Sequence, residues 1–218
     1  AGGALHVVFA VPLNEGRGVT YTRSDDGGAT WQPPVVAFDA VDAGWPMADH
    51  PALAADAAGN LHVAFVRGSG RGPFPPQEIR YLRSTDGGES WSGADGAGAQ
   101  IMVEGAYDDP RLTFFGGQLF LLAHSVDGGL IQRTSADYGL TWGYQQFVPG
   151  FQGLVGPVAL LEGGNGAPIL VGLAKDYADT LAVKVSAWDG SRWSLRDTYD
   201  VGNALAPDAA TQALVGVA

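Results

Sequence analysis

The 218-residue sequence contains no cysteine, which excludes disulfides, thiolate metal sites and a cysteine nucleophile. Basic residues are scarce, because 12 lysines and arginines stand against 23 aspartates and glutamates, and the net charge is −11. A chain this acidic is a poor match for a phosphate backbone or an anionic membrane, so we expect no nucleic-acid partner. No apolar run approaches the roughly 18 residues that a membrane helix needs, so we expect the chain not to span a membrane.

What the sequence does contain points to a folded, strand-rich protein. Hydrophobic residues make up 46% of the chain and charged residues only 16%, which excludes disorder caused by low hydrophobicity and high charge. The 33 glycines and 13 prolines follow no collagen-like period. No segment has a convincing helical period, and short strand-like runs bounded by turn residues recur throughout. The composition therefore predicts many short strands joined by tight turns.

One eight-residue pattern repeats along the chain. It occupies Ser24–Trp31, Ser84–Trp91 and Ser135–Trp142, and a worn fourth copy runs from Ser186 to Trp193. The four serines are separated by 60, 51 and 51 residues. A blade of four short strands takes about 40–50 residues, so each period fits one blade with longer loops.

The pattern has a local physical explanation. An aspartate at its third position can accept hydrogen bonds from amides of its own turn, and a glycine at its fifth tolerates positive φ. The closing tryptophan supplies a large apolar group that anchors the turn to its blade. We therefore expect the aspartates to bond their own turns and the three tryptophans to be mostly buried. The residues with these structural roles are Ser24, Asp26, Gly28, Trp31, Ser84, Asp86, Gly88, Trp91, Ser135, Asp137, Gly139 and Trp142.

Similar strands surround each copy of the pattern. A proline-bearing strand comes first, an apolar strand such as Leu61–Phe65 comes second, a third strand leads into the pattern, and a fourth follows the tryptophan. Equivalent prolines stand at Pro51, Pro110, Pro157 and Pro207. The expected repeats are residues 5–48, 49–107, 108–155 and 156–205, with the start of a further blade at 206–218.

The pattern Ser-x-Asp-x-Gly-x-Thr-Trp resembles the Asp box, or bacterial neuraminidase repeat, and the chain resembles the sialidase-like β-propeller superfamily. This resemblance implies an all-β propeller of four-stranded antiparallel blades, with the boxes away from the active site. Four repeats are visible, and they begin and end on a second strand, a count that does not close a four-bladed ring. We therefore expect a segment of a larger propeller, six-bladed by resemblance, whose remaining blades lie in sequence outside this chain or in a partner chain.

Strand direction indicates which loops carry function. Neighbouring strands run antiparallel, so the boxes share one face, and the opposite face receives the loops after the second strands and the crossovers into the first strands. Propeller pockets form on that opposite face, and its long loops are where binding usually occurs. The candidate residues on this binding face are Trp45, His50, Arg67, Arg71, Phe74, Lys175 and Tyr177.

Catalysis is harder to place. The resemblance implies three arginines around a substrate carboxylate, an aspartate acid/base, and a tyrosine nucleophile polarised by a glutamate. Only Arg111 lies on a first strand, where the equivalent positions carry Ala52, Val158 and Asp208, and no Arg-Ile-Pro motif is present. An aspartate before proline is also an ordinary cap or turn residue. The catalytic candidates, none of them assigned, are Asp49, Asp108, Asp109, Arg111, Tyr107 and Glu104.

Three hypotheses about function follow. The first is a non-catalytic propeller of a secreted or cell-surface protein that binds a glycan or a protein partner through the binding face. The second is an incomplete view of a sialidase-like glycoside hydrolase, and the third is a structural subunit of an extracellular assembly. We expect no cofactor and no metal site, because His6 and His62 share a packing position that Phe120 also occupies in its strand.

Overall fold

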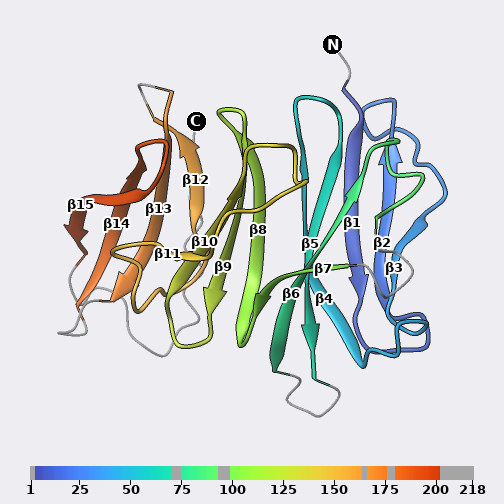
Figure 1. The fold of residues 1–218 in the computed structure, drawn as a ribbon, viewed down its shortest axis with the longest axis horizontal. Helices are drawn as coiled ribbons and strands as arrows, with labels where there is room; N and C mark the ends of the chain where they lie inside the picture. Colours follow the sequence, from blue (N-terminus) through green and yellow to red (C-terminus); the bar gives the residue numbers. More distant parts are fainter. Residues whose placement is uncertain (1–2, 70–74, 93–98, 164–165, 176–179, 202–218) are drawn as a thin grey trace. The chain divides into compact units, whose positions relative to one another are not determined.

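The structure is a computed structural model that describes residues 3–69, 75–92, 99–163, 166–175 and 180–201 (Figure 1). Every regular element in the described residues is a β-strand, and the strands form four antiparallel sheets. The all-β prediction is therefore confirmed. The first sheet has three strands and each of the others has four, with strands in chain order from one edge to the other.

The sheets are named by position along the chain. The first contains β1 (Leu5–Val11), β2 (Gly18–Ser24) and β3 (Val35–Asp39); the second contains β4 (Met47–Ala55), β5 (Leu61–Gly68), β6 (Pro76–Ser84) and β7 (Gln100–Glu104). The third contains β8 (Tyr107–Phe115), β9 (Gln118–Ser125), β10 (Leu130–Ser135) and β11 (Gln146–Phe147); the fourth contains β12 (Ala159–Glu162), β13 (Pro168–Lys175), β14 (Leu181–Trp188) and β15 (Trp193–Asp200).

The chain divides into two compact units, which are described separately. The first comprises Ala1–Ala123 and Arg133–Tyr144, and the second comprises His124–Gln132 and Gln145–Ala218. The first unit holds the first two sheets together with β8 and the turn that follows β10. The second unit holds β11 and the fourth sheet. The expected strand at 206–218 lies outside the described residues.

The turns at 24–31, 84–91 and 135–142, here called the box turns, share one hydrogen-bond pattern. In the first, the Ser24 hydroxyl donates to Asp26 and accepts the Gly28 amide, and the Asp26 carboxylate accepts the Thr30 amide at 2.8 Å. Asp86 and Asp137 accept the amides four residues later in the same way. The prediction that these aspartates bond their own turns is confirmed. These bonds lower the pKa of Asp26, Asp86 and Asp137 to about 2.

A second regular contact joins consecutive sheets. The residue three positions before each box serine meets the tryptophan that ends the next box turn. Tyr21 lies edge-on to Trp91 with ring centroids 5.4 Å apart, and Tyr81 lies edge-on to Trp142 at 5.2 Å. Within the second unit, the Trp193 indole N–H donates to the Gln132 side-chain oxygen at 2.7 Å.

The tyrosines of this contact are held by histidines of the neighbouring strand. His6 Nδ1 lies 2.6 Å from the Tyr21 hydroxyl, and His62 Nδ1 lies 2.6 Å from the Tyr81 hydroxyl. The fully buried His62 also bonds the Asp56 carboxylate through Nε2 at 3.0 Å. Burial lowers the pKa of His62 and raises the pKa of Tyr81, so both groups are neutral near pH 7.

The main core of the first unit lies where the second sheet packs on the first. Val19, Tyr21 and Phe38 of the first sheet form one buried cluster with Leu61, Val63 and Phe65 of β5, closed at one end by Trp91. Trp91 is therefore buried and Trp142 is partly buried, as expected. The expectation is wrong for Trp31, which is 45% exposed, because no described residue stands against it as Tyr21 stands against Trp91.

Candidate functional site

The strands β4 and β8 pack beside each other in the first unit, and they carry the same three-residue motif near their starts. The motif is Asp49-His50-Pro51 in β4 and Asp108-Asp109-Pro110 in β8. In each, the first aspartate accepts the amide of the next residue, at 2.8 Å for His50 and 2.7 Å for Asp109. The two strands therefore present matching turns side by side.

The middle residue of each motif has an unusual backbone. His50 has a φ of 48° and Asp109 a φ of 49°, in the left-handed region that favours glycine. Each also precedes a proline, which restricts the preceding residue to extended conformations. Such a conformation costs about 1–3 kcal/mol per residue. Before Pro157 the chain has Gly156, with a φ of 105°, so glycine does fill the corresponding position elsewhere.

Charged side chains link the two motifs. His50 Nδ1 lies 2.5 Å from Asp108 Oδ1, an ion pair between β4 and β8 when the imidazole is protonated. The hydrogen bond to Asp108 raises the pKa of His50, although its partial burial opposes the shift. One Arg111 N–H donates to Asp109 Oδ2 at 2.9 Å. All four side chains are between about one third and one half exposed, so they remain accessible to a ligand.

His50, Asp109 and Arg111 line a groove between the two strands. Its walls are His50–Leu53 of β4 and Asp109–Leu112 of β8, and its volume is about 390 Å³. The register of β4 against β5 shifts between Asp49 and Ala52, which marks a bulge at the motif. Bulges re-aim side chains and are frequent beside functional sites. The lining combines prolines and aliphatic side chains with three polar side chains, those of His50, Asp109 and Arg111.

The structure places two other predicted binding residues in a packed cluster. The Trp45 ring is only 7% exposed and packs on Phe38 at 4.5 Å between ring centroids. The guanidinium groups of Arg67 and Arg80 each lie 4.9 Å from the centre of the same ring. Neighbouring side chains therefore cover the Trp45 indole, and its assignment to the binding face stays a prediction.

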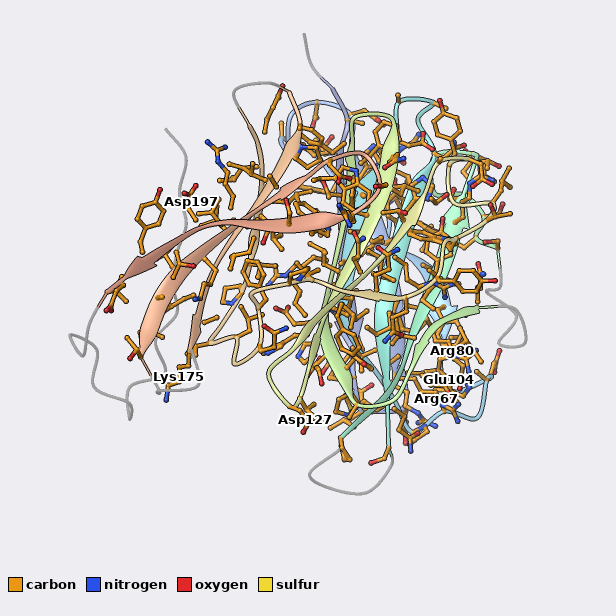
Figure 2. The ribbon with its side chains drawn as sticks, turned by 60° about the vertical axis from the view of Figure 1, so that its left-hand side comes forward. Arg67, Arg80, Glu104, Asp127, Lys175 and Asp197 are labelled. Carbon is orange, nitrogen blue, oxygen red and sulfur yellow. The ribbon has the colours of Figure 1, made fainter. Side chains whose placement is uncertain are left out.

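Arg67 is also occupied. It donates to the Glu78 carboxylate at 3.0 Å, and Glu78 pairs with Arg80 as well. Figure 2 shows Arg67, Arg80 and Glu104 near one another on three neighbouring strands of the second sheet, and Glu104 is paired in register with Glu78. Glu78 therefore pairs with both arginines that lie over the Trp45 ring, and the role of Arg67 in binding stays a prediction.

The remaining predicted residues are not brought into the groove by any described contact. Glu104 ends the edge strand β7, whereas Tyr107 begins β8 in the next sheet, so the chain turns between the two. Lys175 ends β13 in the second unit. Arg71, Phe74 and Tyr177 lie outside the described residues. Of the predicted site residues, the groove and its motifs contain Asp49, His50, Asp108, Asp109 and Arg111.

The groove offers a mixed set of polar groups. Carboxylates accept hydrogen bonds, whereas a protonated imidazole and a guanidinium donate them, a combination that suits the hydroxyl groups of a sugar. A histidine paired with a carboxylate can also move a proton near neutral pH. In the described part of the chain, no group of three or more histidine, aspartate or glutamate side chains is arranged to hold a metal ion.

The pairing of the two motifs was missed by sequence reasoning, although a signal for it was present. Asp49 and Asp108 stand two residues before equivalent prolines of consecutive repeats. Aligning the repeats on Pro51 and Pro110 would have placed these aspartates, and the residues between, at matching positions of adjacent strands. Sequence reasoning gave His50 as a binding candidate and Asp108 as a catalytic candidate, and it did not predict that their side chains contact each other.

Comparisons with known proteins agree on the fold. No family model and no curated protein sequence matches the chain. Among solved structures, the K499G mutant of NanB sialidase from Streptococcus pneumoniae is 16% identical with a TM-score of 0.56, over 84% of this chain and 28% of that one. A leech intramolecular trans-sialidase is 15% identical with a TM-score of 0.51, over 84% and 29%. An ulvan lyase is 10% identical with a TM-score of 0.54, over 89% and 55%.

The chain therefore has a sialidase-like β-propeller fold. It spans only 28% to 55% of the length of these three proteins. At sequence identities this low, the similarity shows the fold alone. Within the described part of the chain, we find no helix with the length and apolarity that a membrane crossing requires.

Proposed function

We propose that the chain is a glycan-binding propeller domain of a secreted or cell-surface protein, and that the glycan lies in the groove between β4 and β8. The observation that carries this proposal is the pair of left-handed, pre-proline residues His50 and Asp109. A glycine would relieve the cost at both positions, yet the chain places there two titratable side chains that line the same groove. Residues with strained backbone conformations cluster at active sites and ligand-binding sites.

The charges of the groove favour an uncharged sugar. Its motifs hold three carboxylates, from Asp49, Asp108 and Asp109, against one guanidinium and one imidazole. Arg111 is already paired with Asp109, and recognition of a carboxylate usually relies on an available, bidentate arginine. A sialic or uronic acid would therefore meet repulsion, whereas the hydroxyl groups of a neutral sugar can use both the donors and the acceptors.

The comparisons support a carbohydrate ligand without specifying it. By their names, the proteins of similar fold with TM-scores above 0.5 include sialidases, a trans-sialidase and an ulvan lyase, all of which act on carbohydrates. The absence of the expected arginine set favours binding over sialidase chemistry, because Ala52 occupies in β4 the position that Arg111 occupies in β8.

Matched pairs of glycans test the proposal. A microarray would present neutral oligosaccharides beside the same structures carrying sialic or uronic acid, and the strongest neutral glycan would then be measured by calorimetry. We expect the neutral member of each pair to bind better. His50→Gly and Asp109→Gly should each weaken binding at least about tenfold. The fold should be retained, because glycine adopts the native φ without strain.

Tyr144→Ala is the matched control, because this side chain is 93% exposed and lies outside the groove. It should leave the affinity unchanged. Retained affinity in both glycine variants, or preferential binding of the acidic glycans, would refute the proposal.

A second candidate function is glycoside cleavage, which the His50–Asp108 pair favours. A histidine with a raised pKa beside a carboxylate can donate a proton to a leaving group. Fluorogenic glycosides of neutral sugars and of sialic acid would reveal it. Turnover that disappears in Arg111→Ala and in His50→Gln would establish an enzyme, and binding without turnover would leave the first proposal in place.

A further inference from the structure

Two clefts within the first unit lie at equivalent positions of consecutive repeats, and neither shares a residue with the groove between β4 and β8. The first cleft has a volume of about 270 Å³ and the second about 500 Å³. Each is lined by the end of the strand that leads into a box turn, β2 or β6, and by part of the next box turn along the chain. Each also contains a tyrosine and an arginine at matching positions, which are Tyr21 and Arg23 in the first cleft and Tyr81 and Arg83 in the second.

The arginine of the first cleft is paired within the protein. Arg23 Nε lies 3.5 Å from the Asp25 carboxylate, and an Arg23 Nη donates to the Gly87 carbonyl at 3.3 Å. Asp25 follows the serine of its own box turn. The positive charge of Arg23 is therefore already matched by a neighbouring carboxylate.

The arginine of the second cleft lacks this partner, because Thr85 occupies the position that Asp25 has in the first box turn. The structure shows no hydrogen bond or ion pair between the Arg83 guanidinium and any other described residue, and the Arg83 Nε is shielded from solvent. A charged group that is partly removed from water without a partner is unfavourable. An anion in the second cleft would therefore be stabilised by Arg83 and would stabilise it in return.

The lining of the second cleft supplies further donors for an oxyanion. The hydroxyl groups of Thr85 and Ser92 and the side-chain amide of Gln100 line it together with Arg83. Ser92 Oγ accepts the Arg83 amide, so its hydroxyl hydrogen can donate to a ligand. These residues come from the box turn, the segment after it and β7. A tetrahedral oxyanion accepts hydrogen bonds from several directions, whereas a carboxylate accepts them near one plane, so the donor set favours the tetrahedral group.

The charges around the second cleft favour a ligand with a single negative charge. Arg83 is the one charged side chain among the described residues that line it. Two carboxylates stand in the adjoining box turns, those of Asp86, which accepts from the lining residue Ser90, and of Asp137. They would repel a second negative charge on the ligand. A sulfate ester carries one negative charge near pH 7, whereas a phosphate ester carries about −1.5 to −2.

We propose that the second cleft binds the sulfate ester group of a small, otherwise uncharged molecule, with the Arg83 guanidinium as the main contact. Thr85, Ser92 and Gln100 donate to the remaining oxygens. The net charge of −11 disfavours a polyanion, which the rest of the surface would repel. This site is separate from the groove between β4 and β8, so it does not depend on the neutral sugar proposed there.

An NMR titration of the whole chain with methyl sulfate tests the proposal, because this probe carries the ester without a sugar. Methyl phosphate, acetate and inorganic sulfate are titrated for comparison. The Arg83 Nε–H signal is identified by its loss in Arg83→Gln. It should shift at lower concentrations of methyl sulfate than of the other three anions, and tighter binding of any of those three would overturn the proposal.

Two substitutions and a matched control locate the site, with binding followed by the backbone amides of Thr85 and Ser92. Arg83→Gln should weaken the binding of methyl sulfate at least about tenfold, because it removes the charge. Thr85→Asp should weaken it similarly, because it gives Arg83 the carboxylate that Asp25 gives Arg23. Its fold should be retained, since the first box turn has aspartate at that position.

Arg23→Gln is the control, and it should leave the affinity for methyl sulfate unchanged, because Arg23 lines the other cleft. The amide spectra of the three variants report whether each is folded. Unchanged affinity in Arg83→Gln or in Thr85→Asp, or an equal loss in Arg23→Gln, would refute the assignment of the second cleft.

Discussion

The first and second sheets of this protein differ in burial although their sequences agree. The same Leu-His-Val-x-Phe strand is fully buried in β5 and about two-fifths exposed in β1, and the box tryptophan changes from 7% exposed in Trp91 to 45% in Trp31. In a protein built of repeats, stability is divided between each repeat and its contact with the next. The comparison bears on both contributions, because the box turns are the same in both sheets, whereas β5 packs on the first sheet and pairs with β4, and β1 is an edge strand of a three-stranded sheet.

The largest difference in the loss of stability between the two sheets is expected when the box tryptophans are replaced. Trp91→Ala should lower the free energy of unfolding by about 3–5 kcal/mol, because it removes a large buried ring that packs on Tyr21. Trp31→Ala in the same 218-residue chain should cost less than about 1.5 kcal/mol, since nearly half of its surface is already in water. Urea unfolding of the two variants measures both values. Equal losses would mean that burial by the neighbouring sheet does not stabilise this contact.

A slightly smaller difference in the loss of stability is expected when the matching phenylalanines of β5 and β1 are replaced. Phe65→Ala should cost about 3–4 kcal/mol, because Phe65 is completely buried against Phe38 and Trp45. Phe9→Ala should cost about 1 kcal/mol, in line with its partial exposure. The two phenylalanines occupy matching positions, so each variant is the control for the other. A larger loss for Phe9→Ala would contradict the assignment of the core.

A smaller difference in the loss of stability is expected between the two histidine–tyrosine pairs. Tyr81→Phe removes a hydroxyl 2.6 Å from His62 Nδ1 in a buried site and leaves that nitrogen without its partner, at a cost of about 1–3 kcal/mol. Tyr21→Phe removes the bond to the partly buried His6 and also the bond that the Tyr21 hydroxyl donates to the Gly87 carbonyl, and about 1–2 kcal/mol is expected. Thermal unfolding at pH 7 would rank the two. A larger loss for Tyr21→Phe than for Tyr81→Phe would contradict the expectation that the fully buried His62 depends most on its partner.

The smallest difference between the sheets is expected in the box turns, because their bonds are local. Hydrogen bonds from Thr30 and from Ser90 lower the pKa of Asp26 and Asp86 to about 2, below the unfolded value. Each carboxylate therefore stabilises the fold above about pH 4, and that contribution is lost as the pH falls through about 2.

Asp26→Asn and Asp86→Asn should accordingly lower the melting temperature by similar amounts at pH 7. The loss relative to wild type should shrink toward zero near pH 2. Melting curves at several pH values measure this convergence, and a loss that stayed constant down to pH 2 would contradict the assigned hydrogen bonds.

Much of the fold could be predicted from the sequence because its information is local and repeated. Each box turn is built from residues within eight positions of one another, so three copies identify the turns, and the glycines and prolines between them bound the strands. Burial depends on the neighbouring sheet, which a repeat does not specify. For this reason Trp31 was predicted to be buried like Trp91, and the packing of Trp45 against Phe38, Arg67 and Arg80 was not foreseen when Trp45 was named as a binding-face candidate.

The residues of the candidate site were predicted one by one, without their contacts. Asp49, His50, Asp108, Asp109 and Arg111 were each named, since charged residues at the start of a first strand are suited to a propeller pocket. Their pairing depends on two strands that are 58 residues apart in sequence and on the backbone angles of His50 and Asp109. Neither the pairing nor a positive φ before proline follows from local preference, which disfavours that conformation.

The central claim is that the groove between β4 and β8 holds a neutral sugar. Hydrogen-exchange mass spectrometry with and without the strongest neutral glycan of the microarray tests it most directly. The account predicts slower exchange in peptides covering residues 47–55 and 107–115, with no change in the box turns at 24–31 and 84–91, and no slowing in either strand of the His50→Gly variant. Slower exchange confined to the box turns, or no slowing anywhere under saturating glycan, would contradict it.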